Sequence, residues 1–242
     1  MDTYLEAKGL EKRYRKKKVV HNVSIKVRRG EIVGLLGPNG AGKTTTFGMI
    51  LGHISQDAGK IYLDGGDITA FPMYLRARKG LCLLPQEPSS FRKLSVGDNL
   101  LAVNEILSDS SPLNESDLIG ILNEFGLAQL LEDKAITLSG GERRRLEIAR
   151  ALTTNPDYIL LDEPFTGIDP LAISDLQKII FSLKERGLGL LITDHSVRET
   201  LKITDRAYIM DKGRILINGT PEEVVHSKKA KSSYLGEEFR LE

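Results

Sequence analysis

One stretch of the sequence decides the fold: Gly37-Pro38-Asn39-Gly40-Ala41-Gly42-Lys43-Thr44. The order of its residues is that of a phosphate-binding loop, in which glycines let backbone N–H groups point at a phosphate. It follows an apolar run at residues 32–36, which suits a strand buried on both faces, and it precedes a helical pattern at residues 45–50. A glycine-rich turn that merely starts a helix is the alternative, but the full pattern in this setting favours a nucleotide site.

Three side chains at the end of this loop can hold a nucleoside triphosphate. Lys43 can neutralise the terminal phosphates, Thr44 can hold Mg²⁺, and Thr45 offers a further phosphate contact. The helix that follows adds positive potential at its N-terminus. The loop therefore predicts a bound nucleoside triphosphate together with Mg²⁺.

A second apolar run, at residues 158–161, ends in the two acids Asp162 and Glu163. Buried carboxylates are costly unless they are paired or bind a metal, and open α/β sheets bind ligands at the C-terminal ends of their strands. Asp162 is therefore the candidate for the Mg²⁺ shell, and Glu163 is the candidate general base for the water that attacks the γ-phosphate. Without the loop at residues 37–44, the pair could equally be solvated residues at a strand end.

The composition is that of a globular chain, with 40% hydrophobic and 28% charged residues and a net charge of +1. This balance gives no broad electrostatic reason to expect a nucleic-acid partner. The single cysteine, Cys82, cannot form an internal disulfide, and its apolar neighbours indicate a buried position. The N-terminus lacks the pattern of a secretory signal, and no apolar run is long enough to span a bilayer. We therefore expect a cytosolic protein that reaches a membrane only through a partner.

The rest of the chain alternates strand and helix patterns, which indicates an α/β core. Residues 188–193 form another apolar run typical of a buried strand, and a polar interruption at residues 108–112 separates two helical patterns. Thr220, followed by a proline and two acids, predicts a helix that begins there and continues into the C-terminal stretch. Short β-branched segments indicate a strand-rich N-terminal region; they are residues 19–20, 23–27 and 61–63.

A second glycine-containing motif identifies the family. The sequence Leu138-Ser139-Gly140-Gly141-Glu142 directly precedes a helical pattern, so Ser139 and the two glycines expose backbone donors at a second helix start. With this motif the chain resembles the ATP-binding cassette (ABC) ATPases, whose signature it is. The resemblance implies a head-to-tail homodimer in which each signature motif closes on the γ-phosphate of the ATP held by the other subunit.

Four further residues take roles that the resemblance implies. Tyr14 resembles the aromatic residue that stacks on adenine, and Gln86 the glutamine that senses Mg²⁺ and the membrane partner. Asp169 resembles the acid that links the two subunits, and His195 the switch histidine beside the γ-phosphate. Taken singly, Tyr14 suits a surface or core position, Gln86 a turn and His195 a satisfied polar group. Their order along the chain favours the family roles.

The resemblance covers practically all of the chain and implies its fold class. We expect an α/β protein with a P-loop NTPase core of mainly parallel sheet, an N-terminal antiparallel β subdomain and a small helical subdomain. Residues 1–242 would form a single ABC ATPase domain, with the helical subdomain at roughly 88–153 and a C-terminal tail at roughly 220–242.

Features outside the catalytic motifs suggest the partner. Residues 165–170 are similar to a subgroup that includes lipopolysaccharide-export and branched-chain amino-acid import ATPases, and several stretches, above all residues 234–241, favour export. Two separate transmembrane permease subunits would then hold the dimer at the cytoplasmic face of the inner membrane. Phe91 and Arg92 are the candidates for the groove that accepts a permease helix, although Phe91 in the subdomain core and a solvated Arg92 are equally compatible with the sequence.

Other members of the superfamily fit the sequence less well. DNA-repair and chromosome-structuring members are split by long coiled coils, and no heptad array interrupts residues 42–138. Translation-associated members normally carry two cassettes, whereas this chain has one phosphate loop and one signature motif. A GTPase would need an Asn-Lys-x-Asp element, which is missing, whereas Tyr14 suits a stacking site with little base selectivity. ATP is the nucleotide that the family resemblance implies.

Overall fold

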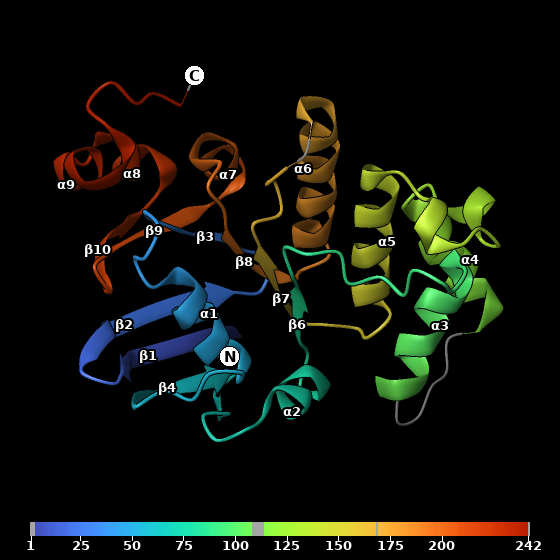
Figure 1. The fold of residues 1–242 in the computed structure, drawn as a ribbon, viewed down its shortest axis with the longest axis horizontal. Helices are drawn as coiled ribbons and strands as arrows, with labels where there is room; N and C mark the ends of the chain where they lie inside the picture. The colour runs from blue at the N-terminus through green and yellow to red at the C-terminus, as the bar shows by residue number, and fades with distance from the viewer. Residues whose placement is uncertain (1–2, 108–113, 168, 242) are drawn as a thin grey trace.

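A six-stranded, mainly parallel sheet lies at the centre of the molecule (Figure 1). The computed structural model describes residues 3–107, 114–167 and 169–241. The strand order is β10-β9-β3-β8-β7-β6, and only β9 and β10 pair antiparallel. The strands are β3 (Ile32–Leu36), β6 (Leu81–Leu84), β7 (Tyr158–Asp162), β8 (Gly189–Thr193), β9 (Arg206–Asp211) and β10 (Arg214–Gly219). The three apolar runs of the sequence are the buried β3, β7 and β8, as predicted.

A four-stranded antiparallel sheet, in the order β2-β1-β4-β5, is built from the N-terminal region. Its strands are β1 (Tyr4–Tyr14), β2 (Lys17–Arg28), β4 (Ala58–Leu63) and β5 (Gly66–Asp67). The predicted segments fall within β2 and β4, but β1 was not predicted. Its buried residues Leu5, Ala7 and Leu10 are separated by charged residues and Gly9, and the register with β2 shifts between Ala7 and Leu10.

Helices cover the central sheet. The phosphate loop is followed by α1 (Lys43–Leu51), and α2 (Met73–Arg78) precedes β6. Between β6 and β7 lie α3 (Val96–Leu107), α4 (Glu115–Glu124) and α5 (Gly140–Leu152), with the 3-10 turns Ala128–Leu130 and Ala135–Thr137. These helices gather on one side of the molecule, at the right of Figure 1. The predicted polar interruption at residues 108–112 lies outside the described residues.

The remaining helices are α6 (Pro170–Glu185), α7 (Val197–Ile203), α8 (Pro221–His226) and α9 (Lys228–Ala230). The first packs in the same buried cluster as α5, and the others pack in a cluster with β9. Within the described ranges, no helix is both long and apolar enough to cross a bilayer. The fold is the predicted one, with a phosphate loop on a mainly parallel sheet beside an antiparallel sheet and a group of helices.

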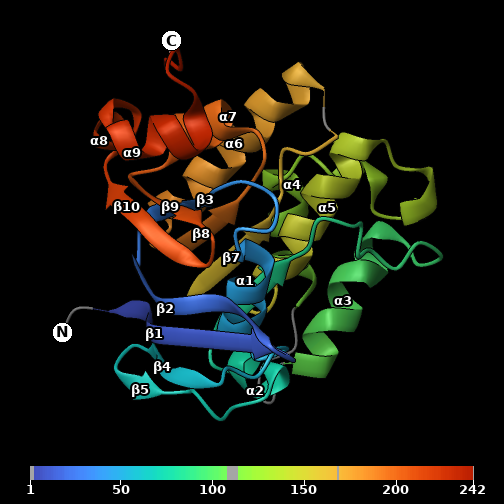
Figure 2. The same ribbon diagram turned by 60° about the vertical axis from the view of Figure 1, so that its left-hand side comes forward.

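The C-terminal stretch is not one helix, so that prediction was wrong beyond its start. Thr220 does cap α8, because its side chain accepts from the Glu223 N–H while Glu223 binds the Thr220 N–H. Ser227 then leaves the helical conformation, with φ −70° and ψ 120°, and begins α9, which leads into a π-helical turn (Lys231–Leu235). Figure 2 shows α8 and α9 beside α7, where apolar residues of the C-terminal stretch pack on the core.

Candidate nucleotide site

The phosphate loop is fixed between β9 and β2. At Gly37, φ is 151° and a Cβ atom would lie 2.0 Å from the Met210 carbonyl oxygen, so only glycine fits. At Gly42, φ is 107° and a Cβ atom would lie 3.0 Å from the Val19 carbonyl oxygen. These close approaches explain the glycines and give the loop one path from β3 into α1.

Lys43 lies inside the loop, with 7% of its surface exposed. Its Nζ donates to the carbonyl oxygens of Gly37, at 2.6 Å, and Pro38, at 3.2 Å. Burial lowers the pKa of Lys43, while the carboxylates of Glu163 and Asp162 act to raise it. The structure thus brings the lysine of the loop and the two acids after β7 into one electrostatic site.

The predicted Mg²⁺ ligands offer only oxygen donors, which suits this ion. Thr193 Oγ1 donates to Asp162 Oδ1 at 2.7 Å and so orients that carboxylate at the end of β7. Thr44 is exposed at the first turn of α1, and Gln86 is exposed after β6. Among the described residues no three His, Cys, Asp or Glu side chains cluster as a metal site. A hydroxyl, an amide and one carboxylate fit Mg²⁺, which keeps several waters and binds substrate phosphates.

Glu163 and His195 are paired. His195 Nε2 lies 2.7 Å from Glu163 Oε1, and the two side chains are 44% and 17% exposed. Glu163 has a φ of 48°, a left-handed conformation that is strained for a residue with a side chain, and its N–H donates to the Thr193 carbonyl oxygen at 2.7 Å. The hydrogen bond to Thr193 therefore fixes the backbone of Glu163, and the contact with His195 orients its carboxylate.

Asp194 is a site residue that the sequence reasoning missed. It is fully buried, and its two carboxylate oxygens accept from the N–H groups of Phe165 and Ser196, each at 2.7 Å. Burial raises the pKa of Asp194, while these two N–H groups act to lower it. Asp194 thereby ties the segment after Glu163 to the segment after His195. An acid directly after a buried strand was the available signal.

The signature motif caps α5. Ser139 Oγ accepts from the Glu142 N–H at 3.3 Å, and Glu142 Oε2 accepts from the Ser139 N–H at 2.8 Å. The hydrogen bonds from Ser139 hold the pKa of Glu142 below its usual range. Ser139 and Gly140 are exposed, so the start of this helix is open to an anion. Gly140 also lines a cleft with Gln86 and Glu163.

Two other predicted residues lie at the edges of the site. The Tyr14 ring is 46% exposed at the end of β1, with Lys12 Nζ 5.7 Å from its centroid. The next strand, β2, places Val19 against the phosphate loop, so Tyr14 belongs to the hairpin that adjoins the loop. Asp169 is exposed and caps α6, because its Oδ1 accepts from the Ala172 N–H at 3.0 Å.

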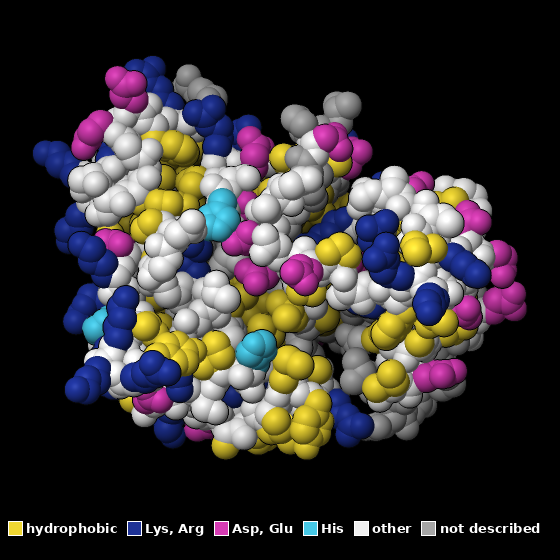
Figure 3. Space-filling model, viewed as in Figure 1, with side chains coloured by type: hydrophobic (Ala, Val, Ile, Leu, Met, Phe, Trp, Pro, Cys, Tyr) yellow, Lys and Arg dark blue, Asp and Glu magenta, His cyan; other side chains and the backbone are white. Residues whose placement is uncertain are grey.

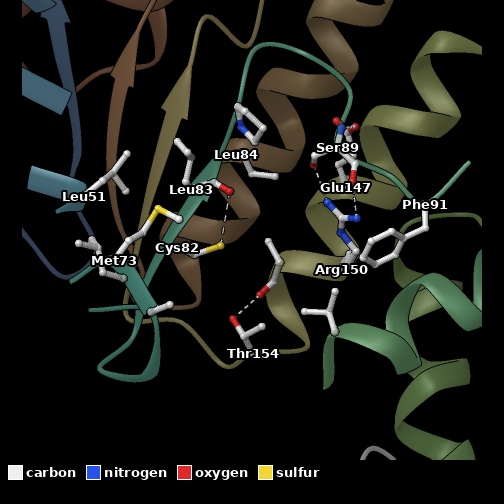
Figure 4. A pocket seen from close by; sticks show the side chains of 15 residues that line it. Leu51, Met73, Cys82, Leu83, Leu84, Ser89, Phe91, Glu147, Arg150 and Thr154 are labelled. Carbon is white, nitrogen blue, oxygen red and sulfur yellow. Dashed lines mark hydrogen bonds between the residues drawn. The ribbon is translucent and has the colours of Figure 1, made fainter. Parts of the chain in front are cut away.

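A separate apolar groove lies between α2, β6 and the helices at the right of Figure 1, with a cavity volume of about 380 Å³. On the face shown in Figure 3, apolar side chains gather around this hollow. Phe91 lines it and is 43% exposed, with the Arg150 guanidinium 5.3 Å from its ring centroid (Figure 4). Arg92 is exposed but does not line the cavity.

The sequence reasoning also missed what holds the segment beside this groove. Glu147, which is 3% exposed, accepts from the Ser89 N–H at 2.7 Å. Arg150 donates to the Ser89 carbonyl oxygen at 2.6 Å and to its hydroxyl at 2.5 Å, as Figure 4 shows. Both side chains come from α5, so the segment that carries Gln86 and Phe91 is anchored to the helix that begins at the signature motif.

Comparison with known proteins agrees with this geometry. The profile of the family described as "ABC transporter" matches residues 20–166. Proteins called "Lipopolysaccharide export system ATP-binding protein LptB" are 53% identical in Haemophilus influenzae and 52% in Escherichia coli K12; each alignment covers 98% of this chain and 99% of the relative. The ADP conformation of an ATP-binding cassette of an ABC transporter superposes with a TM-score of 0.87 at 31% identity, covering 98% of this chain and 100% of that one.

Proposed function

The chain belongs to the ABC transporter ATPase family, and we propose that it is the motor subunit of an exporter whose membrane-spanning parts are separate chains. The observation that carries this proposal is that two helices of one chain begin at glycine-rich turns, which suit an anion. One follows the phosphate loop at Lys43, and the other begins at Ser139. A single ATP has no need of both within one subunit.

A head-to-tail homodimer uses both starts. The exposed signature motif of one copy would close on the γ-phosphate of the ATP held in the loop of the other, and Asp169 would link the two copies. Tyr14, exposed on the adjoining hairpin, would stack on the adenine. ATP binding would then pull the two copies together, and its cleavage would release them.

The hydrolytic step rests on residues already placed together. Glu163 would accept the proton of the attacking water, and His195, 2.7 Å away, would hold the carboxylate toward it. When ATP binds, the Lys43 ammonium would donate to phosphate oxygens in place of the carbonyl oxygens of Gly37 and Pro38. Mg²⁺, held by Thr44, Asp162 and Gln86, would neutralise charge that develops on the phosphates.

The cargo that we propose is lipopolysaccharide, which the chain would help extract from the inner membrane for export. The support is the 52–53% identity to lipopolysaccharide-export ATPases over nearly the full length of both chains. No specific observation favours branched-chain amino-acid import. The dimer would sit at the cytoplasmic face of the inner membrane and be held there by two permease subunits. Co-purification from detergent-solubilised membranes, with peptide identification, tests this: export permeases support the proposal, and import permeases contradict it.

The apolar groove that Phe91 lines leads to a prediction about association with the permease subunits. Phe91→Ala should reduce association with the permease subunits, because it removes a half-exposed ring from the apolar lining while the fold has little need of it. The matched control is Phe181→Ala, since Phe181 is similarly exposed, at 41%, on α6. Co-purified permease should fall at least several-fold for Phe91→Ala and stay at the wild-type level for Phe181→Ala. Equal recovery for both variants contradicts the docking role.

A further inference from the structure

Lys12, two residues before Tyr14 on β1, is held in place by the segment between α1 and β4. Its Nζ donates to the Ser55 carbonyl oxygen and, at 3.0 Å, to Asp57 Oδ1. The second carboxylate oxygen of Asp57 accepts from the Arg13 N–H at 2.6 Å, so the acid is fixed to the same strand. Only 14% of the Lys12 side chain is exposed. The ammonium therefore has one defined position, and it joins β1 to the segment that follows the helix of the phosphate loop.

Lys12 and Tyr14 lie on the side of the antiparallel sheet that meets the phosphate loop. Lys12 pairs with Val20 of β2, and paired side chains share a face of the sheet. The Val20 side chain lies against the loop, since a Cβ atom on Gly42 would be 3.5 Å from its Cγ2. The register shift after Lys12 places the extra residue, Val19, in β2, so the alternation of β1 continues and carries Tyr14 to the same face.

The fixed ammonium also lies over the Tyr14 ring. Lys12 Nζ is 5.7 Å from the ring centroid, which is within the reach of a cation–π interaction. The ring is 46% exposed, so with Lys12 over one face it offers its remaining surface to a ligand. An exposed tyrosine at the end of a strand has several staggered rotamers open to it. Attraction to an ammonium that is itself held in place favours one of them.

We propose that Lys12 is a positioning residue for the nucleotide base, which holds the Tyr14 ring where adenine can stack on it. The inference rests on the proposed stacking role of Tyr14 and adds the group that orients the ring. Lys12 acts through the ring and not on the phosphates, because its ammonium is already bound by Ser55 and Asp57. A ring that is oriented in advance loses less freedom when a base stacks on it, so ATP binds more tightly.

Lys12→Met tests this, because it keeps a long side chain and removes the charge. We expect the affinity for ATP, measured by titration calorimetry, to fall about two- to fivefold, the effect of one exposed cation–π contact. The affinity for inorganic tripolyphosphate should not change, since this ligand has a phosphate chain but no base. Lys12→Arg, which keeps a cation able to stack on the ring, should bind ATP as the wild type does.

The matched control is Lys8→Met. Lys8 lies on the same strand, pairs with Glu6 at 2.9 Å and stacks on Tyr62 at 5.3 Å from the ring centroid. It therefore loses the same kinds of contact away from Tyr14. Lys8→Met should bind both ATP and tripolyphosphate with wild-type affinity, and a loss of ATP affinity equal to that of Lys12→Met would overturn the proposal.

Combining Lys12→Met with Tyr14→Ala separates the remaining outcomes. If Lys12 acts through the ring, Tyr14→Ala weakens ATP binding by itself and Lys12→Met adds no further loss. Equal losses of ATP and tripolyphosphate affinity in Lys12→Met overturn the proposal, because they show damage to the phosphate site. Wild-type ATP affinity in Lys12→Met, with a loss in Tyr14→Ala, overturns this inference alone. Wild-type ATP affinity in Tyr14→Ala removes the stacking role from the proposed function, and this inference with it.

Discussion

Glu163→Gln is expected to lower kcat for ATP hydrolysis by about 100-fold or more, since general base catalysis contributes on the order of 10² to 10⁴. The amide keeps the shape of the side chain and can still accept a hydrogen bond from His195, but it cannot accept the proton of the attacking water. ATP should still bind, because Lys43 and the loop are unchanged. The closed homodimer should therefore accumulate with ATP, which size-exclusion chromatography and phosphate release measure together.

The control for this change is Glu185→Gln, an exposed acid at the end of α6. It should hydrolyse ATP at the wild-type rate. Turnover of Glu163→Gln within a few-fold of wild type would remove Glu163 from the role of base and leave the water to another group.

Lys43→Ala is expected to fail at the earlier step of nucleotide binding. The ammonium can form charge-assisted hydrogen bonds to the terminal phosphates, and losing about 3 kcal/mol of such contacts weakens ATP binding roughly 100-fold. The fold should tolerate the change, because burial already lowers the pKa of Lys43 and so disfavours its charged form in the loop. Titration calorimetry with ATP, together with a thermal melt, checks both parts.

Lys178→Ala is the matched control, since Lys178 is an exposed lysine on α6 that pairs with Asp175. Its affinity for ATP should equal that of the wild type. ATP binding by Lys43→Ala at that same affinity would contradict the proposed phosphate contacts.

Much of the fold could be predicted because its strongest patterns are local. β3 and β7 are continuous apolar runs next to motifs with strict residue order, so both position and burial follow from the sequence. β1 escaped prediction because the alternation of buried and charged residues at its start breaks after Ala7, where Gly9 has a φ of 61° and the register with β2 shifts. The prediction of a single helix after Thr220 was wrong because Ser227 starts a second helix, with its side chain accepting from the Ala230 N–H. The C-terminal stretch packs on the core at this point, and local sequence does not encode that tertiary packing.

Part of the candidate site could likewise be predicted from the sequence, and part of it could not. The resemblance placed Glu163 and His195 in one reaction, and the structure shows them 2.7 Å apart. The residues that the resemblance missed contact segments that are distant in the sequence. Asp194 follows a buried strand, which marks it as a candidate, but it binds backbone that begins at Phe165, and the order of motifs does not predict that contact. Such supporting residues depend on how strands pack, which the order of motifs does not encode.

The most direct test of the composite site mixes two inactive chains. A Lys43→Ala chain and a Ser139→Glu chain should each hydrolyse ATP poorly, the first for lack of phosphate binding and the second because a carboxylate would repel the γ-phosphate. In a mixed dimer, however, the intact loop of the second chain faces the intact signature motif of the first, and random pairing makes about half of all dimers mixed. Phosphate release should therefore reappear on mixing. Continued absence of turnover in the mixture would show that each chain needs its own loop and its own signature motif, and would contradict the shared site.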